Sequence, residues 1–381
     1  MGFLMNMRRI IVIVLLILFV IGCQNPGVKV SSLNELPQTL HEGWNTPRWY
    51  LHNSELDTPL TVVKEKNING LATPAILNPG ARFILTTYNG FLLSTDLQLK
   101  DIGRKRFSRG LSAAPCFARP LAYIASEKGA YGLTAYDLIR QKVQWQLKGY
   151  FSKSSPLVFQ EVLIHATIKG QVLALNRLTG QKIWAYSFPQ KLLQNLAMTE
   201  RTIVVCSGDG LLAAVNLDDG REKFMIELPQ HVYTAPLILN GHVFIADLSG
   251  NILKIALESG EIIADKALET PFYQPLSTDG QTLYIMGSNG RLFALSQDLQ
   301  LKWSLALKGA PSMPIIVTAR RLIVATHQKQ FYLINRQTRN IDQQFTFKRR
   351  VVSCTPAPGG QLLIAMEYDR LARLSLKQEK R

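Results

Sequence analysis

The sequence predicts an all-β fold, an eight-bladed β-propeller with four antiparallel strands in each blade. Three observations predict it. Prolines that open short apolar runs recur every 39 to 42 residues, and glycines lie on a separate forty-residue grid. The last repeat is one strand short, while a β-rich run before the first repeat is left over. A repeat of this length with four short strands is typical of a propeller blade.

The repeat is marked first by proline. The marked positions are Pro74, Pro115, Pro156, Ala197 in the place of a proline, Pro236, Pro275, Pro314 and Pro356. Proline is tolerated at the start of a first strand because no ladder donor is needed there. The grid glycines are Gly90, Gly170, Gly210, Gly250 and Gly290, and its remaining points are Ala130, Gln330 and Arg370. Both markers predict eight units.

The turn between the third and fourth strands has its own signature. In the third unit it reads Ala174, Asn176, Thr179, Gly180 and Trp184, and the other units keep parts of it. We expect the asparagine to cap the turn, the glycine to supply a positive φ, and the aromatic ring to wedge between neighbouring blades. The signature resembles the tryptophan-docking repeat of quinoprotein-type propellers.

Ring closure is predicted from the two ends of the array. The eighth unit has Pro356, then the run 362–365, then 371–376, and offers no fourth strand. The unassigned run Leu60-Thr61-Val62-Val63 precedes the first unit. We expect it to supply the missing strand, so that the N-terminal strand closes the last blade and no free edge remains.

The N-terminus is typical of an export signal. Arg8 and Arg9 precede an apolar run, 10–21, that is shorter than the roughly 20 residues a membrane-spanning helix needs. The segment Val20-Ile21-Gly22-Cys23 resembles a bacterial lipobox, with lipidation at Cys23; an uncleaved anchor and a plain signal peptide are the alternatives. Gln24 in place of an aspartate is the usual pattern for outer-membrane sorting.

These patterns predict four segments. They are a lipoprotein signal peptide at 1–22, a lipid-anchored tether at 23–58, the propeller at 59–377 and a basic tail at 378–381. The predicted location is the periplasmic side of the outer membrane, with the protein held there by its lipid.

Charge and cysteines narrow the function further. The net charge of +16 favours anionic partners such as lipid head groups, lipopolysaccharide or acidic proteins, and the compartment excludes nucleic acid. Cys116, Cys206 and Cys354 show neither a disulfide framework nor metal-ligand spacing, and we expect buried free thiols. His165, inside a strand pattern, is expected to be packed, and no metal site is predicted.

A lipobox, a short tether and an eight-bladed docking-repeat propeller together resemble the BamB family of outer-membrane assembly lipoproteins. The resemblance is sharpest in the third unit, from Val162 to Trp184. It implies a non-enzymatic scaffold whose partner is BamA, the barrel protein with periplasmic repeat domains. It also implies that the loops before the fourth and fifth units, 189–196 and 229–235, bind that partner.

The resemblance assigns five residues of these loops to the partner surface. They are Leu192, Leu193, Gln194, His231 and Tyr233. The chain departs from the family pattern where Gln194 replaces an arginine and where His231 and Tyr233 replace two acids. An exposed leucine pair suits a protein interface; packing of both leucines between blades is the alternative.

Basic residues form a second candidate surface for anionic head groups. Arg104, Lys105, Arg106 and Arg109 lead into the second unit, Lys348, Arg349 and Arg350 lead into the eighth, and Lys64 and Lys66 lead into the first. We expect one basic sector, because these units become neighbours when the ring closes; scattered solvated charge is the alternative.

Two other functions remain open. One is a periplasmic binding propeller for envelope polyanions or for a secretion complex. The other is a quinone-dependent dehydrogenase, which shares the docking repeat. Such enzymes usually carry a disulfide of adjacent cysteines and a calcium site, and this chain has neither an adjacent cysteine pair nor clustered acids. We therefore expect no cofactor and no catalytic residue.

Overall fold

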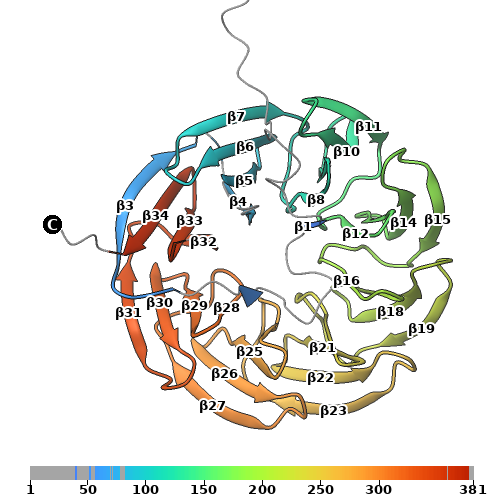
Figure 1. Cartoon of the computed structure of the whole chain (residues 1–381). Helices are drawn as coiled ribbons and strands as arrows, with labels where there is room; N and C mark the ends of the chain where they lie inside the picture. Colours follow the sequence, from blue (N-terminus) through green and yellow to red (C-terminus); the bar gives the residue numbers. More distant parts are fainter. Residues whose placement is uncertain are drawn as a thin grey trace, which may run out of the picture.

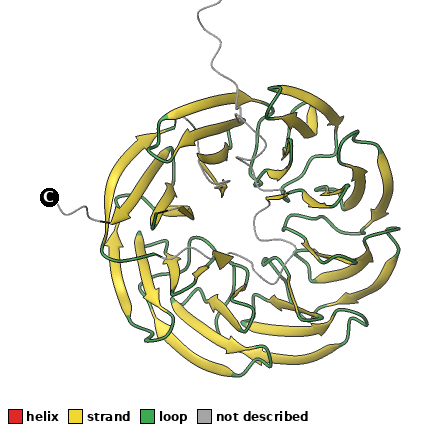
Figure 2. Cartoon of the chain, viewed as in Figure 1, coloured by secondary structure: helices red, strands yellow, loops and turns green. Residues whose placement is uncertain are grey.

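The computed structural model describes residues 39–40, 51–52, 56–68, 70, 72–77, 82–357 and 359–376. Eight sheets stand around a common axis with one strand of each nearest the centre, which confirms the predicted propeller (Figure 1). Strands and short turns make up these residues (Figure 2). None of them belongs to a helix long and apolar enough to cross a membrane. The predicted signal peptide, Cys23 and the basic tail lie outside the described residues.

Each blade is a four-stranded antiparallel sheet whose strands follow in chain order from the centre outwards. Blades 1 to 3 comprise β4 (Ala72–Leu77), β5 (Arg82–Thr87), β6 (Phe91–Asp96), β7 (Asp101–Arg106); β8 (Cys116–Ala118), β9 (Leu121–Ala125), β10 (Tyr131–Asp137), β11 (Lys142–Lys148); and β12 (Leu157–Phe159), β13 (Val162–Ala166), β14 (Gln171–Asn176), β15 (Lys182–Ser187). Blades 4 and 5 comprise β16 (Ala197–Met198), β17 (Thr202–Cys206), β18 (Leu211–Asn216), β19 (Glu222–Glu227); and β20 (Leu237–Leu239), β21 (His242–Ala246), β22 (Asn251–Ala256), β23 (Ile262–Ala267). Blades 6 and 7 comprise β24 (Ser277–Thr278), β25 (Thr282–Met286), β26 (Arg291–Ser296), β27 (Leu301–Ala306); and β28 (Ile316–Thr318), β29 (Arg321–Ala325), β30 (Gln330–Asn335), β31 (Ile341–Thr346).

Blade 8 is closed by the N-terminal strand, as predicted. β32 (Val351–Ala357), β33 (Gln361–Met366) and β34 (Arg370–Leu376) are completed by β3 (Leu60–Asn67), which pairs antiparallel with β34 from Leu60 opposite Leu376 to Asn67 opposite Arg370. The side chain of Gln343, in blade 7, accepts a hydrogen bond from the Leu60 amide (2.8 Å) and donates one to the Leu60 carbonyl (2.7 Å). The closing strand is therefore bonded to both blades beside it.

Two short strands from the predicted tether also join the ring. β1 (Thr39–Leu40) pairs antiparallel with β8 in blade 2, and β2 (Leu51–His52) pairs parallel with β28 in blade 7. Each lies beside the innermost strand of its blade, so these two sheets have five strands. Sequence patterns did not predict this pairing, because two-residue strands carry no measurable periodicity.

The second and third strands of a blade are mostly apolar and buried, because neighbouring blades cover both of their faces. β13 and β17, for example, are buried along almost their whole length. Fourth strands instead alternate between half-buried and exposed residues, as in β15. The half-buried residues of a fourth strand face the next blade, so the contacts between blades, here called seams, hold the core together.

The docking signature works as predicted at the seam between blades 3 and 4. The side chain of Asn176 accepts hydrogen bonds from the backbone amides of Leu178 and Thr179, each at 3.0 Å. The Trp184 indole donates to the Leu217 carbonyl (2.9 Å) and lies against Gly220, whose φ is +73°. A Cβ at Gly220 would stand only 2.6 Å from the indole, so glycine is needed both for its conformation and for the close approach.

Candidate functional site

The loops that leave a fourth strand and enter the next blade all emerge at one end of the ring. Strands alternate in direction within a blade, so the turns between second and third strands emerge at the same end. We call this end the connecting-loop face. It carries both predicted partner loops, 189–196 between blades 3 and 4 and 229–235 between blades 4 and 5.

The predicted leucine pair is divided between the core and the surface. Leu192 is 1% exposed and packs in the core cluster that joins blades 3 to 6, whereas Leu193 is 45% exposed on the connecting-loop face. Adjacent residues of an extended segment point to opposite sides, which explains the division. The expected exposed pair is thus corrected to a single leucine, and Leu192 serves packing between blades.

The same arrangement recurs at forty-residue intervals in the next two loops. Val232 and Phe272 are buried like Leu192, while Tyr233 and Tyr273 are exposed at 52% and 53%. Leu193, Tyr233 and Tyr273 therefore stand on three consecutive loops, and we call them the apolar crescent. Tyr273 was missed by the sequence reasoning, although its spacing from Leu193 and Tyr233 is the signal that would have found it.

Backbone hydrogen bonds hold these loops in place. The Val232 amide donates to the Gly208 carbonyl (3.0 Å), and the Phe272 amide donates to the Asp247 carbonyl (3.2 Å). In each case the connecting loop is hydrogen-bonded to the turn between the second and third strands of the blade that it leaves. The crescent is consequently preorganised, which lowers the entropy lost when a partner binds.

Gln194 and His231 flank the crescent with polar groups. The Gln194 amide donates to the Val232 carbonyl (2.8 Å) and so links the two predicted partner loops. The His231 ring stands 3.8 Å from the Asp209 carboxylate, and both side chains are exposed. The Tyr233 ring lies against Gly208, since a Cβ built there would be 3.3 Å from it. Gln194 thus has a structural partner, while His231 and Tyr233 face outwards.

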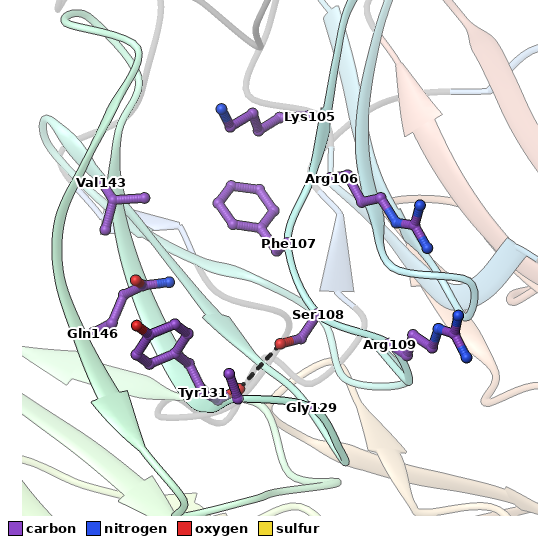
Figure 3. Close-up of a pocket in the computed structure, with 10 residues that line it drawn as sticks. Lys105, Arg106, Phe107, Ser108, Arg109, Gly129, Tyr131, Val143 and Gln146 are labelled. Carbon is purple, nitrogen blue, oxygen red and sulfur yellow. Dashed lines mark hydrogen bonds between the residues drawn. The ribbon is translucent and has the colours of Figure 1, made fainter.

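The predicted basic sector is split by strand geometry in blade 1. Arg104 and Arg106 lie over the Phe91 ring at 3.8 and 5.6 Å, on the side of β7 that faces blade 8. Lys105 lies one residue away and projects to the opposite side, toward blade 2 (Figure 3). Arg109 is exposed on the loop that follows β7.

The basic residues before blade 8 differ from those of blade 1 because carboxylates pair with two of them. Arg349 forms an ion pair with Asp369 (2.9 Å), and Arg350 forms one with Glu367 (3.3 Å) and a hydrogen bond with the His327 ring (2.7 Å). Lys348 is exposed. In the described part of the chain, Lys105, Arg106 and Arg109 of blade 1 have no such carboxylate partner, and in this respect the two predicted halves of the sector differ.

Groups that could carry chemistry are buried or committed to structure. Cys116, Cys206 and Cys354 are free and buried, as predicted, and burial raises the pKa of each thiol, which keeps it protonated. His165 is fully buried, and its Nε2 donates to the Tyr150 carbonyl (2.7 Å). Among the residues that the structure describes, no three or more His, Cys, Asp or Glu side chains gather as a metal site.

Comparison with known sequences and structures gives one consistent family. The sequence profile described as "Outer membrane protein assembly factor BamB" matches residues 100–195, 168–263 and 240–362, which together exceed half of the chain. A protein named outer membrane protein assembly factor BamB from Alkalilimnicola ehrlichii is 28% identical over 144 residues, 37% of each chain. One from Shewanella oneidensis is 24% identical over 221 residues, 52% of this chain and 53% of that one. The chain thus aligns with well under two thirds of either relative.

The fold is shared with solved structures of different names. BamB from Moraxella catarrhalis superposes with a TM-score of 0.68 at 14% identity, covering 84% of this chain and all of that one. Quinohemoprotein alcohol dehydrogenase from Comamonas testosteroni also gives 0.68, at 10% identity, covering 84% of this chain and 77% of that one. At these identities the likeness concerns the fold alone.

Proposed function

The chain belongs to the family of the outer membrane protein assembly factor BamB, and on that premise we propose that it is a non-enzymatic scaffold lipoprotein that helps to assemble β-barrel proteins in the outer membrane. Its proposed partner is a BamA-like barrel protein that offers periplasmic repeat domains. The observation that carries the proposal is the apolar crescent, three exposed anchors on consecutive, preorganised loops.

The crescent has the composition of a binding surface. Tyrosine is enriched in the residues that dominate protein interfaces, since it buries a large rigid area and still offers a hydroxyl. Leu193, Tyr233 and Tyr273 are exposed large hydrophobic side chains on these loops, and the residue before each of them is buried. Exposed apolar side chains grouped in this way mark an interaction site more often than the same residues scattered singly.

The departures from the family pattern favour an interface with little ionic character. Gln194 stands where an arginine is expected from the resemblance, and its amide bonds within the protein. His231 and Tyr233 stand where two acids are expected. We therefore expect binding of the partner to depend on apolar contact and to change little with ionic strength.

A scaffold role also agrees with how the described acids are used. Asp137 and Asp247 accept backbone amides in turns, Asp137 from Ile139 and Arg140 and Asp247 from Ser249 and Asn251. These carboxylates stabilise the repeat, as asparagine does elsewhere. They are not grouped in a cleft as a general acid and base would be.

The lipid anchor at Cys23 and a location on the periplasmic side of the outer membrane form part of the same proposal. The Cys23→Ser variant is the test, because serine cannot accept the thioether-linked lipid. We expect the unaltered chain to take up labelled palmitate and to fractionate with the outer membrane, and the variant to do neither. Equal membrane association of both would contradict the anchor.

The function is tested by replacing the crescent. A Tyr233→Ser and Tyr273→Ser double variant of the full chain should recover at least about tenfold less barrel protein in a detergent pull-down, because the lost anchors are aromatic. Tyr368→Ser is the matched control: Tyr368 is also exposed on the connecting-loop face but belongs to blade 8, across the ring. Equal recovery by the double variant and the control would overturn the proposed surface.

A further inference from the structure

A pocket of about 520 Å³ lies at the seam between blades 1 and 2, away from the apolar crescent. Lys105 and Phe107 form one wall, and Val143, Gln146 and Tyr131 form the other (Figure 3). Ser108 lies between the walls, where its hydroxyl donates to the Tyr131 carbonyl (3.3 Å).

The pocket lies where this seam departs from the repeat. In the strand register, the position of Trp184 in blade 3 is occupied in blade 1 by Gly103, and that of Tyr186 by Lys105. Two large rings that fill the seam between blades 3 and 4 are thus replaced by a hydrogen atom and a flexible chain. Phe107, in the register of Phe188, keeps an edge-to-face contact with Tyr136 at 5.2 Å, which holds the ring in place as a wall of the pocket.

The charge of the pocket also differs from that of the seam between blades 3 and 4. Between blades 3 and 4 the Tyr186 hydroxyl donates to the Glu222 carboxylate across the seam. In blade 2 the register position of Glu222 is held by Val143, so Lys105 faces an apolar side chain and not an acid. The seam therefore presents a cation without the carboxylate that stands at this register in blade 4.

Other cations reinforce this field. Arg106 and Arg109 lie at the edge of the pocket, with their guanidinium groups on the other side of β7 (Figure 3). In the described part of the chain, no carboxylate lies within ion-pair distance of Lys105, Arg106 or Arg109. The nearest acid in the adjoining turn, Glu127, pairs with Lys153 (3.7 Å).

We propose that this pocket binds a phosphate ester. Lys105 would hold the phosphate oxygens while Phe107, Tyr131 and Val143 contact the uncharged part of the ligand. A phosphate monoester is favoured over a carboxylate because Arg106 and Arg109 at the edge add to the positive potential of Lys105, and such a phosphate carries up to two charges with three acceptor oxygens. The ester belongs either to a soluble phosphorylated sugar or to a lipid that ends in a phosphate monoester.

The test uses the full chain in detergent and isothermal titration calorimetry with two probes. Glucose 6-phosphate, with glucose as its uncharged control, represents the soluble source. Micelles doped with phosphatidic acid, against micelles doped with diacylglycerol, represent the lipid. Binding of glucose 6-phosphate assigns the pocket to phosphate monoesters whether or not they carry a lipid, and binding of phosphatidic acid alone assigns it to lipid.

Variants connect the binding to the pocket. Lys105→Gln removes the cation, and Val143→Glu places opposite it the acid that blade 4 carries; each should weaken binding about tenfold or more. Val143→Gln is the neutral control and should bind as the unaltered chain does. Lys266→Gln is the matched control, because Lys266 occupies the register of Lys105 in blade 5 but is followed by Ala267 and Glu269.

The folding of every variant is checked by its thermal midpoint, which should be unchanged because Val143 and Lys105 are at least partly exposed. The proposal is overturned if neither probe binds. It is also overturned if binding is the same in Lys105→Gln and Val143→Glu as in the unaltered chain, since the ligand would then be held elsewhere.

Discussion

Two seams of the propeller are built from the same repeat, yet one is closed by side chains and the other contains a pocket. Between blades 3 and 4, Trp184 donates to the Leu217 carbonyl and Tyr186 reaches Glu222, which closes the seam. Between blades 1 and 2 the corresponding fourth-strand residues are Gly103 and Lys105, and the seam contains a pocket. The comparison shows that residues which keep the repeat pattern pack the seam, whereas residues which depart from it are candidates for a function.

The largest effect on stability is expected when the closed seam between blades 3 and 4 is opened. Trp184→Ala should lower the free energy of unfolding by about 4 kcal/mol, because a half-buried indole and its hydrogen bond are both lost. Denaturant unfolding measures it. Ile183→Ala, at the exposed neighbouring position of β15, is the control and should change stability little. Equal losses in the two variants would mean that the indole does not close the seam.

A third seam, between blades 2 and 3, supplies a pH-dependent test. Burial lowers the pKa of His165 from 6.5 to about 4, with the hydrogen bond to the Tyr150 carbonyl opposing that shift. The unfolded chain thus binds a proton before the folded one does, so stability is complete above pH 6.5 and falls as the pH drops toward 4. The loss attributable to His165 should reach about 3 kcal/mol at pH 4.

The variant His165→Gln isolates this contribution, because an amide can still donate to Tyr150 but does not titrate. Denaturant unfolding between pH 7.5 and pH 4 should show a shallower decline for the variant than for the unaltered chain. Parallel declines would show that His165 is not held neutral in the folded protein.

A smaller effect is expected where the docking ring meets the next blade. Gly220→Ala should lower the free energy of unfolding by about 2 kcal/mol, because the added Cβ meets the Trp184 ring and the residue keeps a positive φ. Gly241→Ala is the control: its φ is also positive, but no atom lies within 4 Å of the added Cβ. The difference in unfolding free energy between the two variants measures the cost of the contact between the added Cβ and the Trp184 ring. Equal values would show that this contact costs nothing.

The smallest effect concerns the polar contact that the open seam lacks. Tyr186→Phe should lower the free energy of unfolding by about 1 kcal/mol, because it removes one hydrogen bond to Glu222 and keeps the ring. In a double-mutant cycle, Tyr186→Phe should cause no further loss once Glu222→Ala has removed the carboxylate. Coupling close to zero in that cycle would show that the pair does not stabilise the seam.

Much of the fold follows from the sequence because its signals repeat. Eight units, the capped turns and the closing strand at Leu60 were each predictable, since every blade restates the same pattern. Two features were not. Pro74 and Pro356 lie inside β4 and β32 and not before them, and β1 and β2 extend two blades with only two residues each. β1 and β2 depend on pairing with distant strands, which local sequence does not encode, whereas β4 and β32 begin before their prolines because they pair with β5 and β33 from an earlier residue.

The candidate sites were less predictable because side-chain direction and pairing decide them. Leu192 and Leu193 are alike in sequence, yet one is buried and the other exposed. Arg104 and Lys105 are adjacent, yet they face different blades. Arg349 finds its acid, Asp369, twenty residues away across a sheet. A list of basic or apolar residues therefore locates a loop but not the surface that the loop presents.

The most direct test of the scaffold assignment is photocrosslinking in living cells from a reactive amino acid placed at Tyr233, with Ile183 on the outer rim as the reference position. Both side chains are about half exposed. We predict that position 233 captures a barrel protein with periplasmic repeat domains and that position 183 does not. Capture of that protein from position 183 and not from position 233 would contradict the account.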